Sequence, residues 1–368
     1  MLVMRKALIP VSLVTLLLAA LALSAVSVDA AVSSDPFTRS QSTAVKEGMN
    51  GALLDTLLRH IEAQNARTDS ADRIDAVLVI RHGNVVLEQY PDFLRPATLV
   101  RPLGTATQSV VSLLVGIAID QDLVKGTNDP LGLYFPTAGA SQAITIEHAL
   151  TMTAGLAWSE AQTFAADSDV PALASSPDPV AFVLGRPSVA APGERFLASS
   201  GLAHVLSALL AEVTGAPAGL FAREFLFDPL AIGASPWLED SVGNTRGWSG
   251  LSLTPRDLAK VGVLCLGRGV WSGREIVSPE WIAAATSPHV AVPTAAQPTR
   301  GLGYLWWTDA GADLYYAEDL ASIGLYLCPA LDLVVVLAGT TADGDVVLFN
   351  LVRDYILPAA VAETLALR

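Results

Sequence analysis

Apolar and polar positions recur along the chain with two periods, and each period predicts a different element. Residues 51–64 (GALLDTLLRHIEAQ) repeat apolar side chains every three to four positions, which predicts an amphipathic helix. Residues 75–90 (DAVLVIRHGNVVLEQY) form two apolar runs joined by His82-Gly83-Asn84, which predicts a β-hairpin. Further strand patterns and a closing helix follow late in the chain, at residues 301–310, 324–328, 331–339 and 347–365.

Between the hairpin and the late strands the patterns are those of helices and loops, punctuated by proline and glycine. This order of elements predicts an α+β fold, an antiparallel sheet flanked by helices with an inserted helical lobe. We expect a domain over residues 46–368. Its sheet lobe would comprise residues 46–130 and 250–368, and its helical lobe residues 131–249.

One predicted helix, Gly104–Asp120 (GTATQSVVSLLVGIAID), has a polar front end. Its uncharged stretch of about fifteen residues is too short, and its front end too polar, for a membrane span. The apolar back half predicts a core helix. Four polar side chains fall instead on one helical face that begins at the N-terminus, where backbone N–H groups are free: Thr105, Gln108, Ser109 and Ser112.

The N-terminal residues have the pattern of an export signal. Arg5 and Lys6 precede an uncharged apolar stretch, which small residues end at Ala30. The pattern predicts a signal peptide at residues 1–30 and a loose polar leader at residues 31–45. The alternative is an uncleaved anchor, because the apolar stretch is long enough to span a bilayer. In both cases we expect export, to the periplasm or as a secreted protein, with membrane contact only through this segment if it is uncleaved.

Composition narrows the possible partners and cofactors. The 368 residues carry a net charge of −14 with four lysines and no basic run, which argues against nucleic acid and anionic membrane surfaces. No Cys/His set has metal-ligand spacing and no phosphate-binding loop is present, so we expect neither a metal nor a cofactor. Export would permit a disulfide between Cys265 and Cys328, but both lie in apolar runs that predict buried thiols, and the pairing stays open.

Six segments resemble, in order, the segments of one enzyme family. They are SVVSLLVGIAIDQDLVKGTNDPLGLYFP, ITIEHALTMTAGLAWSE, PGERF followed by SSG, LSLTPRDLAKVGVLCLGRGVWSGREIVSPEWI, GLGYLWW and PALDLVVVLAG. The family is that of the serine beta-lactamase-related hydrolases, which include class C beta-lactamases, penicillin-binding proteins, esterases and 6-aminohexanoate-dimer hydrolases. The resemblance covers roughly residues 72–358 and implies a beta-lactamase/transpeptidase-like fold.

The same resemblance implies that the family's catalytic groups are replaced here. Its Ser-x-x-Lys motif aligns with Thr105 to Gln108, so threonine stands for the nucleophile and glutamine for the lysine. Its tyrosine aligns with Ala198. Its glycine-rich third motif aligns with a segment that contains Ala321 and Ser322. All three catalytic elements are therefore degenerate.

A threonine hydroxyl acts as a nucleophile only with a base, and a glutamine amide does not accept a proton at neutral pH. The loss of one positioned base costs on the order of 10²–10⁴ in rate. The candidates for a relocated base are Glu318, Asp319 and His148.

Three functions remain open from the sequence. The first is an inactive family member (a pseudoenzyme) that binds a peptide-like or cell-envelope ligand. The second is a weak esterase or amidase with Thr105 as nucleophile, and the third is a structural partner protein that acts through its outer surface. For the first we expect the old substrate cleft to be lined by Thr105, Gln108, Ser109, Ser200 and Ser322.

Overall fold

The structure is a computed structural model of the chain. It describes residues 35–38, 41–68, 71–92, 94–136, 142–160, 168–319, 322–341 and 345–361. The predicted signal peptide lies outside these residues. Within the segment predicted as a leader, Pro36–Thr38 forms a short 3₁₀ helix (η1) with Pro36 buried, and the Ser42 N–H donates to the Val85 carbonyl over 3.0 Å.

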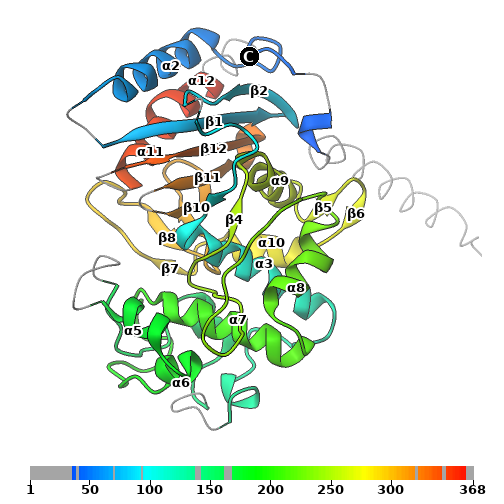
Figure 1. Cartoon of the computed structure of the whole chain (residues 1–368), viewed down its shortest axis with the longest axis vertical. Coiled ribbons are helices and arrows are strands. Elements are labelled where there is room, and N and C mark those ends of the chain that lie inside the picture. The colour runs from blue at the N-terminus through cyan, green and yellow to red at the C-terminus, as the bar shows by residue number, and fades with distance from the viewer. Residues whose placement is uncertain are drawn as a thin grey trace, which may run out of the picture.

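The upper half of the molecule in Figure 1 is built on an antiparallel sheet. Within the described residues it has eight strands in the order β2-β1-β12-β11-β10-β9-β8-β7. The prediction of an antiparallel sheet with flanking helices is thus confirmed. The strands are β1 (Arg73–Arg81), β2 (Asn84–Gln89), β7 (Val290–Ala291), β8 (Arg300–Leu302), β9 (Trp307–Asp309), β10 (Leu314–Asp319), β11 (Ile323–Cys328) and β12 (Leu333–Thr340).

The predicted hairpin is confirmed as β1 and β2. His82 and Gly83 connect the two strands with φ angles of 50° and 70°, the left-handed conformation that a tight two-residue turn requires. β1 is buried along almost its whole length, because helices cover both faces of the sheet at this strand. Its side chains therefore read as a continuous apolar run rather than as an alternating one.

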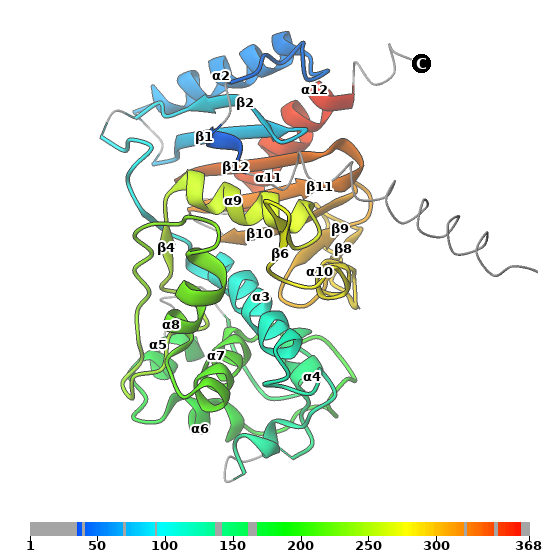
Figure 2. The ribbon, with the colours of Figure 1, turned by 90° about the vertical axis from the view of Figure 1, so that its right-hand side faces the viewer.

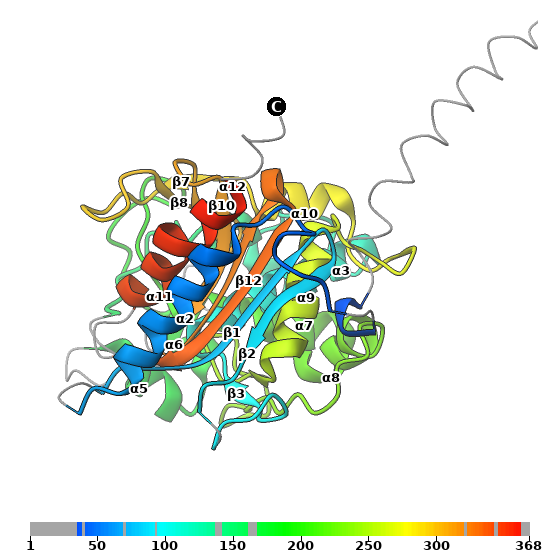
Figure 3. The same ribbon diagram turned by 90° about the horizontal axis from the view of Figure 1, so that it is seen from above.

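Helices cover the sheet on two sides (Figure 3). One side carries α2 (Gly51–Asn65) and the C-terminal helices, which are α11 (Asp345–Leu351), the π-helical turn η6 (Val352–Ile356) and α12 (Leu357–Val361). The other side carries α9 (Pro255–Leu266). Thr254 caps α9, since its hydroxyl accepts the Asp257 N–H over 3.1 Å.

The two cysteines lie on opposite faces of the sheet. Cys265 is on α9, whereas Cys328 at the end of β11 faces the helices of the other side. Both are buried and free, so the disulfide considered from the sequence is not formed. Burial raises the pKa of both thiols, that of Cys328 to about 11, which keeps them protonated and unreactive.

The helical region lies below the sheet in Figure 2, and α3 (Thr107–Asp120) runs between the two. The 3₁₀ turn η2 (Gly104–Ala106) leads into α3, which contacts α7 on one side and β10 on the other. The other helices of this region are α4 (Ile146–Leu150), α5 (Asp169–Ser175), α6 (Pro179–Leu184), α7 (Ser200–Thr214), α8 (Ala218–Ala222) and the π-helical η4 (Arg223–Phe227).

Short elements complete the described chain. They are η3 (Leu131–Leu133), η5 (Pro329–Leu331), α10 (Pro279–Ala285), the pair β3 (Arg101–Pro102) with β4 (Ser252–Leu253), and the pair β5 (Val270–Trp271) with β6 (Arg274–Glu275). No single helix in the described part of the chain is long and apolar enough to cross a membrane. One pair, Ser200–Thr214 with Ala218–Phe227, passes by length and composition together, with a bend of 79°.

Candidate functional site

The front end of α3 and the turn before it hold the polar side chains that the sequence singled out. Gln108, Ser109 and Ser112 are buried, with 7%, 3% and 0% of their surface exposed. Thr105, in the turn η2, is exposed. Of these four residues, only Thr105 is therefore exposed to solvent.

Asp319, the last residue of β10, lies directly against Thr105. Its Oδ1 accepts the Thr105 backbone N–H over 2.9 Å and lies 3.2 Å from the Thr105 Oγ1. The same hydroxyl is also 3.0 Å from the Glu318 carbonyl oxygen, and its single hydrogen can satisfy one of the two acceptors at a time. Both donors of Thr105 are thus engaged within the protein.

Gly104 makes room for this carboxylate. It adopts a φ of +51°, and a Cβ placed on it would lie 2.0 Å from Asp319 Oδ1. No side chain fits at this position while Asp319 keeps its place. Asp319 can therefore lie against this turn only because residue 104 has no side chain.

Ser322 binds the other oxygen of the same carboxylate. Its Oγ donates to Asp319 Oδ2 over 2.8 Å. Asp319 thereby brings together Thr105 and Ser322, two of the residues assigned to the cleft. Ala321, the remaining third-motif position, lies outside the described residues.

Gln108 and Ser109 are hydrogen-bonded into the core. The Gln108 side-chain amide donates to the Trp248 carbonyl over 3.5 Å, and the Ser109 hydroxyl donates to the Leu305 carbonyl over 2.6 Å. Both side chains connect α3 to neighbouring loops. Neither side chain supplies a basic group beside Thr105.

The second-motif positions lie at the start of α7. Ala198 is exposed and Ser200 is buried, with 4% of its surface accessible. The Ser200 N–H donates to a carboxylate oxygen of Glu160, which also accepts the Trp158 indole N–H over 2.6 Å. The Ser200 hydroxyl has no hydrogen-bond partner among the described residues. Glu160 thus satisfies the helix N-terminus, and Ser200 lies inside the protein rather than on an open wall.

Only one of the three candidate bases reaches Thr105. The Glu318 side chain points to the opposite face of β10, where its carboxylate accepts the Tyr326 hydroxyl over 2.5 Å. His148 caps α4 with Nδ1, which accepts the Thr145 N–H over 3.1 Å, and burial lowers its pKa. Asp319 is therefore the acid–base group next to the Thr105 hydroxyl.

A buried His–Asp pair near α3 was not predicted from the sequence. His204 of α7 and Asp240 expose 0% and 1% of their side chains, and His204 Nε2 lies 3.0 Å from Asp240 Oδ2. Burial acts to raise the pKa of Asp240, but hydrogen bonds from His204 and from two backbone N–H groups outweigh it and lower the pKa to about 2. The His204 ring also packs edge-on against Trp248, with the ring centroids 4.7 Å apart. Through this contact the His204–Asp240 pair holds Trp248, whose carbonyl accepts the Gln108 amide, in place.

No signal in the sequence links His204 to Asp240, because they are 36 positions apart and each stands alone among apolar or loop residues. Among the described residues, no group of three or more His, Cys, Asp or Glu side chains is placed to hold a metal ion.

Comparison with known proteins identifies the family and the fold of this chain. A family model for beta-lactamase matches residues 63–348, more than half of the chain, and the chain belongs to this family. A comparison with curated protein sequences finds no match.

Solved structures are similar over most of the chain. A protein from Bacillus anthracis assigned as a 6-aminohexanoate-dimer hydrolase has a TM-score of 0.68 at 15% identity, with 82% of this chain and 81% of that one covered. An octameric penicillin-binding protein homologue from Pyrococcus abyssi has a TM-score of 0.67 at 18% identity, covering 83% and 77%. A protein from Bacteroides dorei assigned as a beta-lactamase has a TM-score of 0.66 at 17% identity, covering 84% and 99%. At these identities the likeness establishes the beta-lactamase/transpeptidase fold.

Proposed function

We propose that this member of the beta-lactamase family no longer hydrolyses acyl substrates and serves, after export, as a binding or scaffolding protein of the cell envelope. The observation that carries the proposal is the Asp319 carboxylate. It accepts the Thr105 N–H and the Ser322 hydroxyl, and it lies within hydrogen-bond distance of the Thr105 hydroxyl. The hydrogen-bond donors of Thr105 and Ser322 are thus satisfied by acceptors of the protein itself.

Two physical arguments support the loss of hydrolysis. An acyl-transfer site needs free donors aimed at the developing oxyanion, and the loss of one such donor costs about 10²–10³ in rate. Here the Thr105 N–H is occupied by a carboxylate, whose charge also repels an approaching oxyanion. Gln108 cannot replace the missing lysine as a base, because its amide nitrogen has no available lone pair and is held by the Trp248 carbonyl.

A ligand of this site would bind at the exposed edge formed by Thr105 and Ser322. It would have to displace Asp319 or bind over it, because the carboxylate already uses both residues. A peptide-like or other cell-envelope ligand fits the proposal, since backbone carbonyls and carboxylates can accept the same donors. The neutral, hydroxyl-bearing residues then serve recognition rather than bond cleavage.

One observation favours a second candidate, a weak esterase or amidase. The 3.2 Å between Thr105 Oγ1 and Asp319 Oδ1 is a nucleophile–base distance. In that reaction Thr105 Oγ1 would attack the acyl carbon while its proton passes to Asp319. The proton would then pass to the leaving alcohol or amine as the acyl–oxygen or acyl–nitrogen bond breaks. In a second step water would attack the acyl carbon of the Thr105 ester and give a proton to Asp319, and this proton would pass to Thr105 Oγ1 as the acyl–Oγ1 bond breaks and the acid leaves.

Turnover assays of Asp319 variants separate the two candidates. The purified protein is incubated with activated esters and nitrocefin, alongside Thr105→Val and Asp319→Asn. We expect equal, background rates for all three, because no activated nucleophile is present. Turnover that both substitutions abolish would instead identify a Thr105–Asp319 hydrolase.

A further inference from the structure

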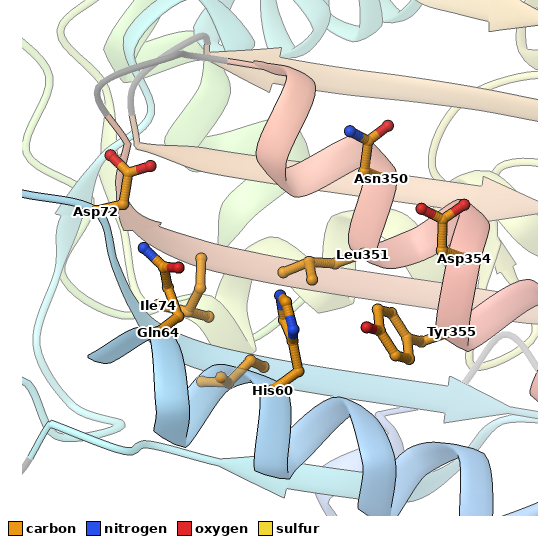
Figure 4. Close-up of a pocket in the computed structure, with 9 residues that line it drawn as sticks. His60, Gln64, Asp72, Ile74, Asn350, Leu351, Asp354 and Tyr355 are labelled. Atoms are coloured by element: carbon orange, nitrogen blue, oxygen red, sulfur yellow. The ribbon is translucent and has the colours of Figure 1, made fainter. Parts of the chain in front are cut away.

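A cavity of about 300 Å³ lies on the side of the sheet that carries α2 and the C-terminal helices (Figure 4). It opens between α2 and the α11–η6 segment, beside the start of β1. Its volume is at the lower end of the range for small-molecule sites, which suits a ligand built on a single ring. Nine residues line it: His60, Ile61, Gln64, Asp72, Ile74, Asn350, Leu351, Asp354 and Tyr355.

The floor of the cavity is apolar and belongs to the core. Ile61, Ile74 and Leu351 expose 1%, 1% and 4% of their surface. His60 of α2 and Tyr355 of η6 lie at the opening, with their ring centroids 5.5 Å apart and their planes tilted by 33°. A flat apolar group on this floor can therefore also contact an aromatic ring.

The charged groups at the cavity are already engaged. Asp354 pairs with Arg353, whose Nε and Nη2 donate to its carboxylate over 2.7 and 3.0 Å. Asp72 and Gln64 also have partners within the protein. Among the described residues, no lysine or arginine lines the cavity. The lining therefore offers neither a free carboxylate to a cation nor a cationic side chain to an anion, which favours an uncharged ligand.

Three other polar groups of the lining are not used by the fold. The His60 imidazole, the Tyr355 hydroxyl and the Asn350 amide form no hydrogen bond with any residue that the structure describes. In Figure 4 the Tyr355 hydroxyl lies on the side of its ring that faces His60. A neutral imidazole, a hydroxyl and an amide each offer both a donor and an acceptor. A ligand group that itself donates and accepts can therefore bond to more than one of them.

We propose that this cavity binds a small uncharged molecule, a flat ring that carries an amide or a similar group with both a donor and an acceptor. The ring lies on Ile61, Ile74 and Leu351, and the amide bonds to the His60 imidazole and the Tyr355 hydroxyl at the opening. Convergent polar groups over an apolar floor are the usual composition of a small-molecule site. The proposal does not depend on whether the Thr105 site is active.

Titration calorimetry of the full chain tests the proposal with benzamide as the probe, at pH 8, where an ordinary histidine is neutral. Benzylamine and benzoate carry the same ring with a positive and a negative group. We expect benzamide to bind about tenfold more tightly than either ion, because neither finds a free counter-charge in the lining to compensate for its lost hydration. No binding of benzamide, or binding of either ion as tight as that of benzamide, would overturn the proposal.

Variants locate the binding. His60→Ala and Tyr355→Phe are each expected to weaken benzamide binding about fivefold, since each removes one hydrogen-bonding group, and Tyr355→Phe keeps the ring. Asp55→Asn, at an exposed position of α2, is the matched control and should bind benzamide as the unchanged protein does. His60 is exposed and Tyr355 is half-buried, so both variants should fold; if one does not, Asn350→Ala replaces it. Unchanged binding in both variants would contradict this location of the site.

Discussion

At the scale of single residues, Asp319 organises the candidate site. Its two carboxylate oxygens contact Thr105, in the turn before α3, and Ser322, the residue that precedes β11. Thr105 and Asp319 are 214 positions apart in the chain. The sequence offered three possible bases. Asp319 and Glu318 are distinguished only by the face of β10 that each side chain occupies, and His148 lies apart from both on α4.

Replacement of Asp319 should measure how much the contacts stabilise the fold. We expect Asp319→Ala to lower the free energy of unfolding by about 2 kcal/mol, because charge-assisted hydrogen bonds are lost at a partly exposed site. Asp319→Asn should lose less, since its amide oxygen can still accept the Thr105 N–H. Urea denaturation measures both. An Asp319→Ala variant as stable as the unchanged protein would show that the carboxylate is not held as described.

The buried His204–Asp240 pair predicts a pH dependence. The folded-state pKa of Asp240, about 2, lies below its ordinary value of 3.8, so the folded state binds this proton more weakly than the unfolded chain. The resulting stability is present above pH 3.8 and is lost as the pH falls towards 2. Denaturation curves at several pH values should show a smaller decline between pH 4 and 2 in Asp240→Asn. An identical decline in both proteins would contradict this assignment.

At the scale of elements, the hairpin and the core half of α3 follow from local patterns. Apolar runs bounded by turn residues predicted a strand at β1 and a core helix at α3, and both elements are buried along almost their whole length. The contacts of the candidate site cannot be predicted from local patterns. Gln108 and Ser109 lie on the polar face predicted for them, yet their partners are carbonyl groups of distant loops, which no local pattern encodes.

The turn before α3 offers a test of the link between backbone and site. Gly104→Ala should be destabilising, because its Cβ would overlap the Asp319 carboxylate and its φ is positive. The loss should be smaller in an Asp319→Ala background, where only the backbone strain remains. A double-mutant cycle by urea denaturation measures this coupling. Strictly additive effects would contradict the packing of Asp319 against Gly104.

At the scale of the whole molecule, the order of six motifs was enough to indicate the family, which the family model confirms over residues 63–348. The sequence left the pairing of Cys265 and Cys328 open because the apolar runs around them do not report which face of the sheet each occupies. The sequence likewise did not predict that residues of α2, such as His60, and residues of η6, such as Tyr355, line one cavity, because these helices come from the two ends of the described chain. Sequence motifs were therefore enough to assign the family, whereas the contacts within a site depend on segments that are distant in the chain.

The proposed function requires that Thr105 is not an activated nucleophile. Intact-mass spectrometry of the protein after incubation with a fluorophosphonate or penicillin probe tests it most directly, because a covalent adduct accumulates even when turnover is slow. We predict no adduct at Thr105, and spectra identical to those of Thr105→Val. A probe adduct mapped to Thr105, and absent from both Thr105→Val and Asp319→Asn, would contradict the account.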